Sequence, residues 1–257
     1  MKAAGERDPI SCSRRLALAS LALALVASFA IPGSTGEQDY KLERAAMVRT
    51  IEFHAQEAIL ALPGHHIDPK VLEVLRTVPR HEFVPGALRQ ASYADYPLPI
   101  GYGQTISQPF IVALMTDVLN AGPRDIVLEV GTGSGYQAAV LAQLVRQVYT
   151  IEVIPALAES AAHRLSQLGY ANVSVREGDG YYGLPEAAPF DGIMVTAAAG
   201  HIPPPLLQQL KPGGRMVIPV GPSLGLQHLT VVERAPDGRF RTRQLFPVRF
   251  VPLAGQH

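Results

Sequence analysis

Three alternating glycines mark the part of the sequence best suited to binding a ligand. Gly131, Gly133 and Gly135 follow an apolar run, residues 126–130, and precede a helix-forming run, residues 136–144. Glycine tolerates positive φ and lacks the Cβ atom that would keep a ligand away from the backbone. The first turn of the following helix supplies unpaired N–H groups. The pattern therefore predicts a strand, a tight turn and a helix that together bind a nucleotide-like cofactor.

The spacing of these glycines argues against a dinucleotide cofactor. The dinucleotide motif is Gly-x-Gly-x-x-Gly, whereas here Tyr136 stands at the last position and the third glycine comes one residue earlier. Preceded by Glu129, the run resembles the first motif of the S-adenosylmethionine (SAM) methyltransferases. Taken alone, it would suit an ordinary strand-to-helix connection equally well.

Two acidic residues end later strand candidates. Glu152 closes residues 148–152, about 20 residues beyond the first glycine, which is the spacing at which a carboxylate reaches a ribose diol. Asp179, followed by Gly180, comes after residues 173–176 and could accept a hydrogen bond from an adenine amino group. The alternatives are a solvated glutamate at a strand end and an ordinary Asp-Gly turn. Because Glu152 and Asp179 would both lie at the same edge of a parallel sheet, we favour the cofactor site.

Composition excludes several other kinds of function. Lys and Arg together number 22, and Asp and Glu together also number 22. The chain therefore has no excess of basic residues to indicate a nucleic-acid partner and no excess of acidic residues to indicate a cationic partner. The only cysteine, Cys12, lies near the N-terminus, which leaves no thiolate, disulfide or cysteine nucleophile for the rest of the chain. Adjacent His65 and His66 lack metal-site spacing, so we expect no bound metal.

The N-terminal residues resemble a signal peptide. Arg14 and Arg15 precede an apolar run, residues 16–31, which contains a small-x-small pattern at residues 28–30. We predict a leader of residues 1–38 and a single domain of residues 39–257. An uncleaved membrane anchor and a true start at Met47 are the alternatives. Export through residues 14–30 would separate the chain from cytosolic SAM, so the leader and the cofactor predict different locations.

From residue 125 onward, strand-like and helix-like segments alternate. The expected strands are residues 126–130, 148–152, 173–176, 193–195 and 216–220. Between the second and third of these, Leu157, Ala161, Leu165 and Leu168 recur at helical spacing and predict a buried helix face. Residues 227–233 and 239–245 flank a turn and predict a hairpin. The fold class is therefore α/β, a doubly wound and mostly parallel sheet with a C-terminal antiparallel hairpin.

The segment before the glycines makes the resemblance specific. Residues 96–109 have the sequence YPLPIGYGQTISQP and residues 80–85 the sequence RHEFVP, and together they closely resemble the protein-L-isoaspartate O-methyltransferases. Further matches are PFD at residues 189–191, VTAAA at 195–199, LKPGGR at 210–215 and VRFVPL at 248–253. The resemblance extends from about Leu72 to Leu253.

The resemblance implies a Rossmann-like SAM methyltransferase that methylates the free α-carboxylate of L-isoaspartyl and D-aspartyl residues in damaged proteins. The ester then closes to a succinimide, which reopens partly to normal aspartate. An α-carboxylate is already ionised at neutral pH, so no general base is required and positioning does most of the work. The family and the cofactor together favour a cytoplasmic location. We expect a monomer with damaged proteins or peptides as partners, and no stable membrane association unless the leader is retained as an anchor.

The same resemblance assigns roles to individual residues. Ser107 matches the active-site serine, with Thr105 and Ile106 on the methyl-donor side. Glu129, Gly131 and Gly133 match positions around the methionine part of SAM, Glu152 the ribose position, and Asp179 with Gly180 the adenine position. Two features differ from the usual pattern: Gly200 and His201, in a loop beside the substrate, and the leader. We expect His201 to face solvent.

Three alternatives remain open. Ser107 precedes Pro109 and an apolar-periodic run, so it could cap that helix. A nicotinamide-dependent oxidoreductase could use the same sheet, although Tyr136 and the lack of a Tyr-x-x-x-Lys pair argue against it. An exported SAM-fold protein could bind modified proteins without turnover.

Overall fold

The computed structural model describes residues 37–57, 66–223 and 225–255. Residues 1–36 of the predicted leader, which include its cleavage pattern, and His65 lie outside these residues. The first helix is α1 (Glu37–Glu57), and its first two residues overlap the predicted leader. In the described part of the chain, no helix combines the length and apolar character needed to cross a bilayer.

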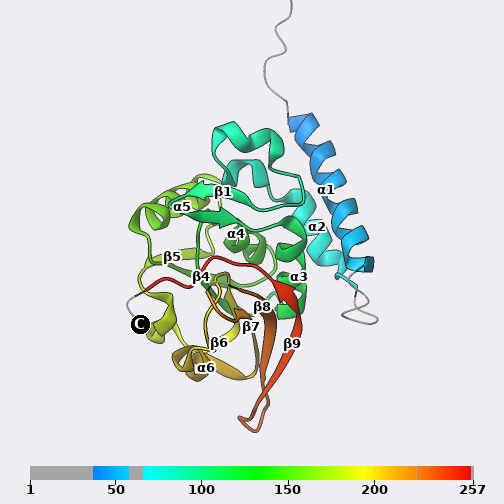
Figure 1. Cartoon of the computed structure of the whole chain (residues 1–257). Coiled ribbons are helices and arrows are strands. Elements are labelled where there is room, and N and C mark those ends of the chain that lie inside the picture. The colour runs from blue at the N-terminus through cyan, green and yellow to red at the C-terminus, as the bar shows by residue number, and fades with distance from the viewer. Residues whose placement is uncertain (1–36, 58–65, 224, 256–257) are drawn as a thin grey trace, which may run out of the picture. The chain divides into compact units, whose positions relative to one another are not determined.

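A seven-stranded sheet forms the centre of the fold (Figure 1), in the order β5-β4-β3-β6-β7-β8-β9. The strands are β3 (Ile126–Val130), β4 (Gln147–Glu152), β5 (Val173–Glu177), β6 (Phe190–Val195), β7 (Leu210–Val220), β8 (Gln227–Arg234) and β9 (Phe240–Val248). Strands β3 to β7 pair in parallel, whereas β8 and β9 pair antiparallel. The predicted fold class, including the C-terminal hairpin, is confirmed.

The strand order places β3 between β4 and β6, so the chain leaves β3 toward one side of the sheet and returns on its other side. Ligands of open α/β sheets bind outside the carboxyl ends of the strands at such a switch point. The glycine run follows β3 directly. The topology therefore puts this run where a ligand site is expected.

Helices and a small two-stranded sheet surround the central sheet. The α-helices after α1 are α2 (Pro69–Thr77), α3 (Pro109–Leu119), α4 (Tyr136–Ala142), α5 (Pro155–Gln167) and α6 (Pro204–Gln209). The 3-10 helices are η2 (Arg80–Phe83), η3 (Gly86–Ala91), η4 (Gly180–Tyr182) and η5 (Pro185–Ala187), and β1 (Leu98–Gly101) pairs antiparallel with β2 (Gln104–Ile106). Helices α1 and α2 pack against α3 and against each other (Figure 1).

The hydrophobic core has two parts because successive strand residues point to opposite faces of the sheet. In β3, Val127 belongs to the larger part, which α1 to α4 cover, whereas Leu128 and Val130 belong to the smaller part, which includes Leu206 of α6. The predicted α5 face is largely confirmed: Leu157, Ala161 and Leu165 are buried and Leu168 is half-buried.

Candidate functional site

The carboxyl ends of β3, β4 and β6 border a cavity that also receives residues from β2 and from the C-terminal segment. Every site residue predicted from sequence lines this cavity except Asp179; these are Thr105, Ile106, Ser107, Glu129, Gly131, Gly133, Glu152 and Gly180. The structure thus brings together residues from four separate stretches of sequence. Thr196, at the end of β6, also lines the cavity.

The three glycines of the run have positive φ angles, which residues with side chains rarely adopt. Gly131 has φ 99°, and a Cβ atom there would collide with Oγ1 of Thr196. That hydroxyl donates hydrogen bonds to the carbonyl oxygens of Val130 (2.9 Å) and Gly131 (2.6 Å). Thr196 therefore holds the turn from the neighbouring strand. Sequence reasoning gave it no role, although it belongs to the family-like run at residues 195–199.

Glu152 is almost fully buried and bonds to the backbone of the glycine run. Its Oε2 accepts a hydrogen bond from the Gly133 N–H (2.8 Å), and its Oε1 accepts one from the Ile154 N–H (3.0 Å). A carboxylate has about four lone-pair positions, so acceptor capacity remains for ligand hydroxyl groups. The predicted ribose residue therefore also fixes the shape of the turn that would hold the cofactor.

Glu129 is fully buried, and only one of its oxygens is satisfied within the described chain. Oε2 accepts a hydrogen bond from Oγ1 of Thr150 (2.5 Å), which lies 2.6 Å from Oγ1 of Thr132. Oε1 has no hydrogen-bond partner among the residues that the structure describes. Burial raises the pKa of Glu129 to about 8; the Thr150 hydrogen bond opposes this shift and the charge of Glu152 adds to it. An unsatisfied buried acceptor beside a cavity suits a ligand that brings a donor.

Ser107 lies between β2 and α3 with its side chain half-buried. The alternative prediction that it caps α3 is wrong. The N-cap residue is Gln108, and the carboxylate of Asp95 accepts the hydrogen bond from the Phe110 N–H (2.8 Å) in its place. Within residues 37–57, 66–223 and 225–255, the Ser107 hydroxyl makes no hydrogen bond to the protein and is open to a ligand.

A second hollow meets the first at Ser107. Thr105, Ser107, Thr196 and Val251 line both. The second, which we call the outer groove, is lined by apolar side chains, by His54 and Glu57 of α1, and by Arg249. Its apolar residues include Phe110, Ile111, Leu226, Phe246, Val248 and Phe250. Ser107 thus stands where the cavity and the outer groove meet.

The remaining predicted residues lie beside the cavity. The carboxylate of Asp179 accepts the Tyr181 N–H (3.0 Å) at the start of η4, and the backbone of Gly255 packs against it. His201 is exposed, as expected, and its Nε2 lies 3.1 Å from the Tyr181 hydroxyl. No group of three or more potential metal ligands occurs in the part of the chain that the structure describes.

Comparison with known proteins identifies the family. The family model described as protein-L-isoaspartate(D-aspartate) O-methyltransferase matches residues 56–257. A protein-L-isoaspartate O-methyltransferase 2 of Syntrophobacter fumaroxidans is 61% identical over 91% of this chain and 95% of its own. The chain belongs to this methyltransferase family. A protein-L-isoaspartate O-methyltransferase 1 of Cupriavidus necator is 55% identical over 93% of this chain and 91% of its own.

Solved structures of the family share the fold. One protein-L-isoaspartate O-methyltransferase superposes with a TM-score of 0.70 at 27% identity, over 82% of this chain and 66% of that chain. Another, a Plasmodium falciparum protein solved in complex with S-adenosyl-L-homocysteine, gives a TM-score of 0.67 at 24% identity, over 84% of this chain and 98% of that chain. The resemblance inferred from residues 96–109 and the glycine run is confirmed.

Proposed function

We propose that this chain catalyses SAM-dependent O-methylation of the free carboxylate of L-isoaspartyl and D-aspartyl residues in damaged proteins. One observation carries the proposal: the free hydroxyl of Ser107 stands where the cofactor-type cavity meets the outer groove. A methyl donor in the first and a peptide in the second would meet beside this side chain. The ester product closes to a succinimide, which begins the repair.

The residues of the first cavity fit SAM. The orphaned Oε1 of Glu129 offers an acceptor for an ammonium group, and Glu152 offers acceptors for ribose hydroxyls. Gly180 lines the same cavity, and Asp179 beside it would accept the adenine amino group. SAM supplies an electrophilic methyl group on a sulfonium sulfur.

The chain itself has to orient the substrate and exclude water. A carboxylate oxygen forms the new O–CH3 bond as the C–S bond breaks, and no proton has to move. Ser107 would donate a hydrogen bond to the other carboxylate oxygen, while Thr105 and Ile106 line the donor side. Because opposite charges are neutralised in this step, alignment and a dry site contribute more than acid–base groups.

The outer groove fits a peptide. Its apolar side chains would cover the residues that flank the isoaspartyl residue. Because several of its lining residues are half-exposed, the ends of the bound peptide would extend into solvent. Such a surface gives little selectivity for a particular folded protein. We therefore infer that the substrates are unfolded or mobile segments that carry the damaged residue.

The test is methyl-ester formation from labelled SAM by the full chain. An isoaspartyl peptide should be methylated and its aspartyl twin should not. Binding of SAM without methylation of either peptide would favour the alternative of a binding protein without turnover. Binding of a nicotinamide cofactor in preference to SAM would favour the oxidoreductase.

We also infer that the enzyme works in the cytoplasm as a monomer, because SAM is supplied there and the proposed site is assembled from one chain. Cell fractionation with sequencing of the mature N-terminus tests the location. Recovery from the periplasm with an N-terminus just beyond Ala30 would contradict it and would support export through residues 14–30.

A further inference from the structure

Arg80 is an arginine buried completely in the protein interior. Its Nε donates to the carbonyl oxygen of Ser92 and its Nη2 to the carbonyl oxygen of Ser107, both at 2.7 Å. Its guanidinium also lies over the ring of Tyr136, 4.7 Å from the centroid. Tyr136 is the residue directly after the glycine run. Arg80 therefore connects the backbone of Ser107 to the start of α4.

A buried charge of this kind needs an explanation. Apolar replacement of buried ionic groups is often neutral or stabilising, so stability by itself does not account for an arginine here. Burial lowers the pKa of Arg80. What the guanidinium provides is a planar fork whose two donors reach two carbonyl oxygens in fixed directions. Apolar residues cannot do this.

Asp95 holds the residues that follow Ser107. Its Oδ1 accepts the Phe110 N–H (2.8 Å), and its Oδ2 accepts from Nε2 of Gln108 (2.8 Å). The same Oδ2 lies 2.5 Å from Nδ1 of His54, which belongs to α1, and the Asp95 side chain is 5% exposed. Arg80 and Asp95 together therefore fix residues 107–110.

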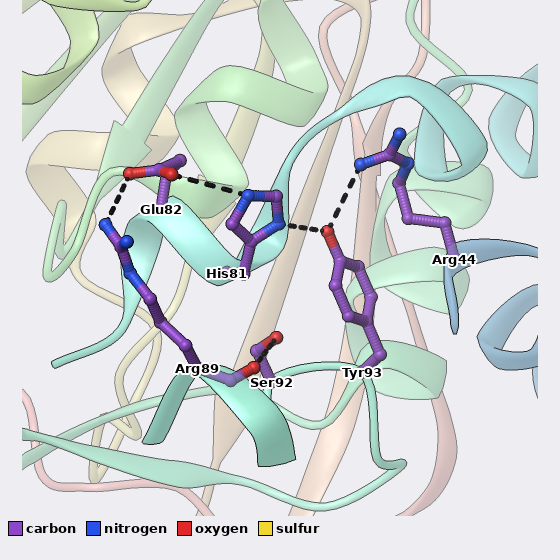
Figure 2. A network of polar contacts seen from close by, with 6 residues as sticks. All are labelled: Arg44, His81, Glu82, Arg89, Ser92 and Tyr93. Atoms are coloured by element: carbon purple, nitrogen blue, oxygen red, sulfur yellow. Dashed lines mark hydrogen bonds and ion pairs between the residues drawn. The ribbon is translucent and has the colours of Figure 1, made fainter. Parts of the chain in front are cut away.

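The segment between these contacts, residues 92–95, is itself anchored by a network of polar contacts that runs from buried Tyr93 and His81 to exposed Arg89 (Figure 2). The Tyr93 hydroxyl lies 2.6 Å from Nδ1 of His81 and accepts a longer contact from Arg44 of α1 (3.5 Å). On its other side, Nε2 of His81 lies 3.3 Å from Glu82, which Arg89 also contacts (2.9 Å). Segment 92–95 is thus held by α1, η2 and η3 together.

Neither Arg80 nor Asp95 lines the cavity or the outer groove. We propose that both are positioning residues for the methyl transfer, which fix the backbone of residues 107–110 so that the Ser107 hydroxyl faces the junction of the two hollows. The inference rests on the proposed function. It has a plain physical basis, since a misplacement of about 1 Å at a reacting centre can lower a rate about 100-fold.

The first test uses Arg80→Lys, with Arg76→Lys in the exposed part of α2 as the matched control. Lysine keeps the charge, but all its N–H donors are on one nitrogen atom, which cannot reach both carbonyl oxygens as Nε and Nη2 of the guanidinium do. We expect kcat on an isoaspartyl peptide to fall by about 10- to 100-fold. The Kd for SAM and the peptide KM should each change by less than about threefold, and Arg76→Lys should match the wild type.

Asp95→Asn is the second variant, with Asp237→Asn in the exposed hairpin as its control. Asparagine keeps the shape and one acceptor, so we expect the protein to fold and kcat to fall by about tenfold. This variant keeps the proposal testable if Arg80→Lys lowers Tm too far for assay. An unchanged kcat in Asp95→Asn and in every folded Arg80 variant would overturn the proposal.

A double-mutant cycle with Ser107→Ala distinguishes positioning from general destabilisation. If Arg80 and Asp95 act through the serine, their substitutions should cost little further kcat once the hydroxyl is gone. If each substitution lowered kcat by the same factor in the wild type and in Ser107→Ala, Arg80 and Asp95 would act elsewhere, which would overturn the inference. Failure of the proposed function gives a different result: the wild type and both control variants would show no methylation at all.

Discussion

The buried carboxyl of Glu129 makes the stability of the ligand-free protein depend on pH in a direction that can be worked out. Burial raises its pKa to about 8 from 4.5, so the folded state keeps a proton that the unfolded state has lost between these values. The free energy of unfolding must therefore fall as the pH rises through this window. The stability that the protonated Glu129 carboxyl contributes is fully present below about pH 4.5 and lost above about pH 8.

Replacing Glu129 by glutamine removes this dependence while keeping the shape of the side chain. At about 1.4 kcal/mol for each pH unit in the window, the ionised carboxylate lowers stability by at most about 5 kcal/mol. The Thr150 hydrogen bond, which favours the ionised form, is already included in that pKa. We expect Glu129→Gln to match the wild type near pH 5 and to exceed it by several kcal/mol near pH 8.

Denaturant unfolding of the ligand-free protein at pH 5, 6, 7, 8 and 9 measures the difference directly. Glu159→Gln, at an exposed position of α5, is the matched control and should follow the wild type at every pH. A stability difference between Glu129→Gln and the wild type that stays constant with pH would refute the reasoning. It would mean that water reaches Glu129 and that the carboxyl ionises normally.

Three further changes address the proposed site. Ser107→Ala should lower kcat by at least about tenfold and leave Tm and the Kd for SAM unchanged, because its hydroxyl caps no helix; loss of SAM binding together with a lower Tm would contradict this. Glu152→Gln should weaken SAM binding by about tenfold or more in calorimetry, because it loses charged acceptors for both backbone N–H groups and ligand hydroxyls; unchanged affinity would remove it from the site. Gly131→Ala should lower Tm and abolish SAM binding, since its Cβ meets Thr196 at φ 99°. Gly103→Ala, also at positive φ but in open space, is the control and should retain SAM binding. Equal losses of binding in both variants would show that backbone strain alone is responsible.

Much of the fold follows from local sequence. The apolar runs ending in Val130 and Glu152 are too short for helices and stand between turn residues, so their strand character can be predicted. The hairpin at β8 and β9 follows from its turn in the same way. Strand ends were less predictable: β7 begins at Leu210, six residues before the predicted start at 216, because its pairing with β6 includes a register shift.

Two features of the site were beyond sequence reasoning. Ser107 had the position and chemistry of a helix cap, and only the fold showed that Asp95 makes this bond. Arg80 was recognised as part of a family-like motif but received no role, since its contacts with Ser92 and Ser107 span 12 and 27 residues. Helical spacing and turn chemistry describe neighbours only a few residues apart.

The sequence by itself determined which groups the site has available: a glycine turn after a strand, acids at the ends of the next strands, and the serine before α3. These depend on backbone sterics and on strand direction, which act locally. Only the tertiary structure decided which of these groups remain free for a ligand. Among the described residues, Oε1 of Glu129 and the Ser107 hydroxyl have no hydrogen-bond partner, because distant strands and helices pack around them and satisfy the neighbouring groups instead. Packing, unlike local propensity, is a property of the whole chain.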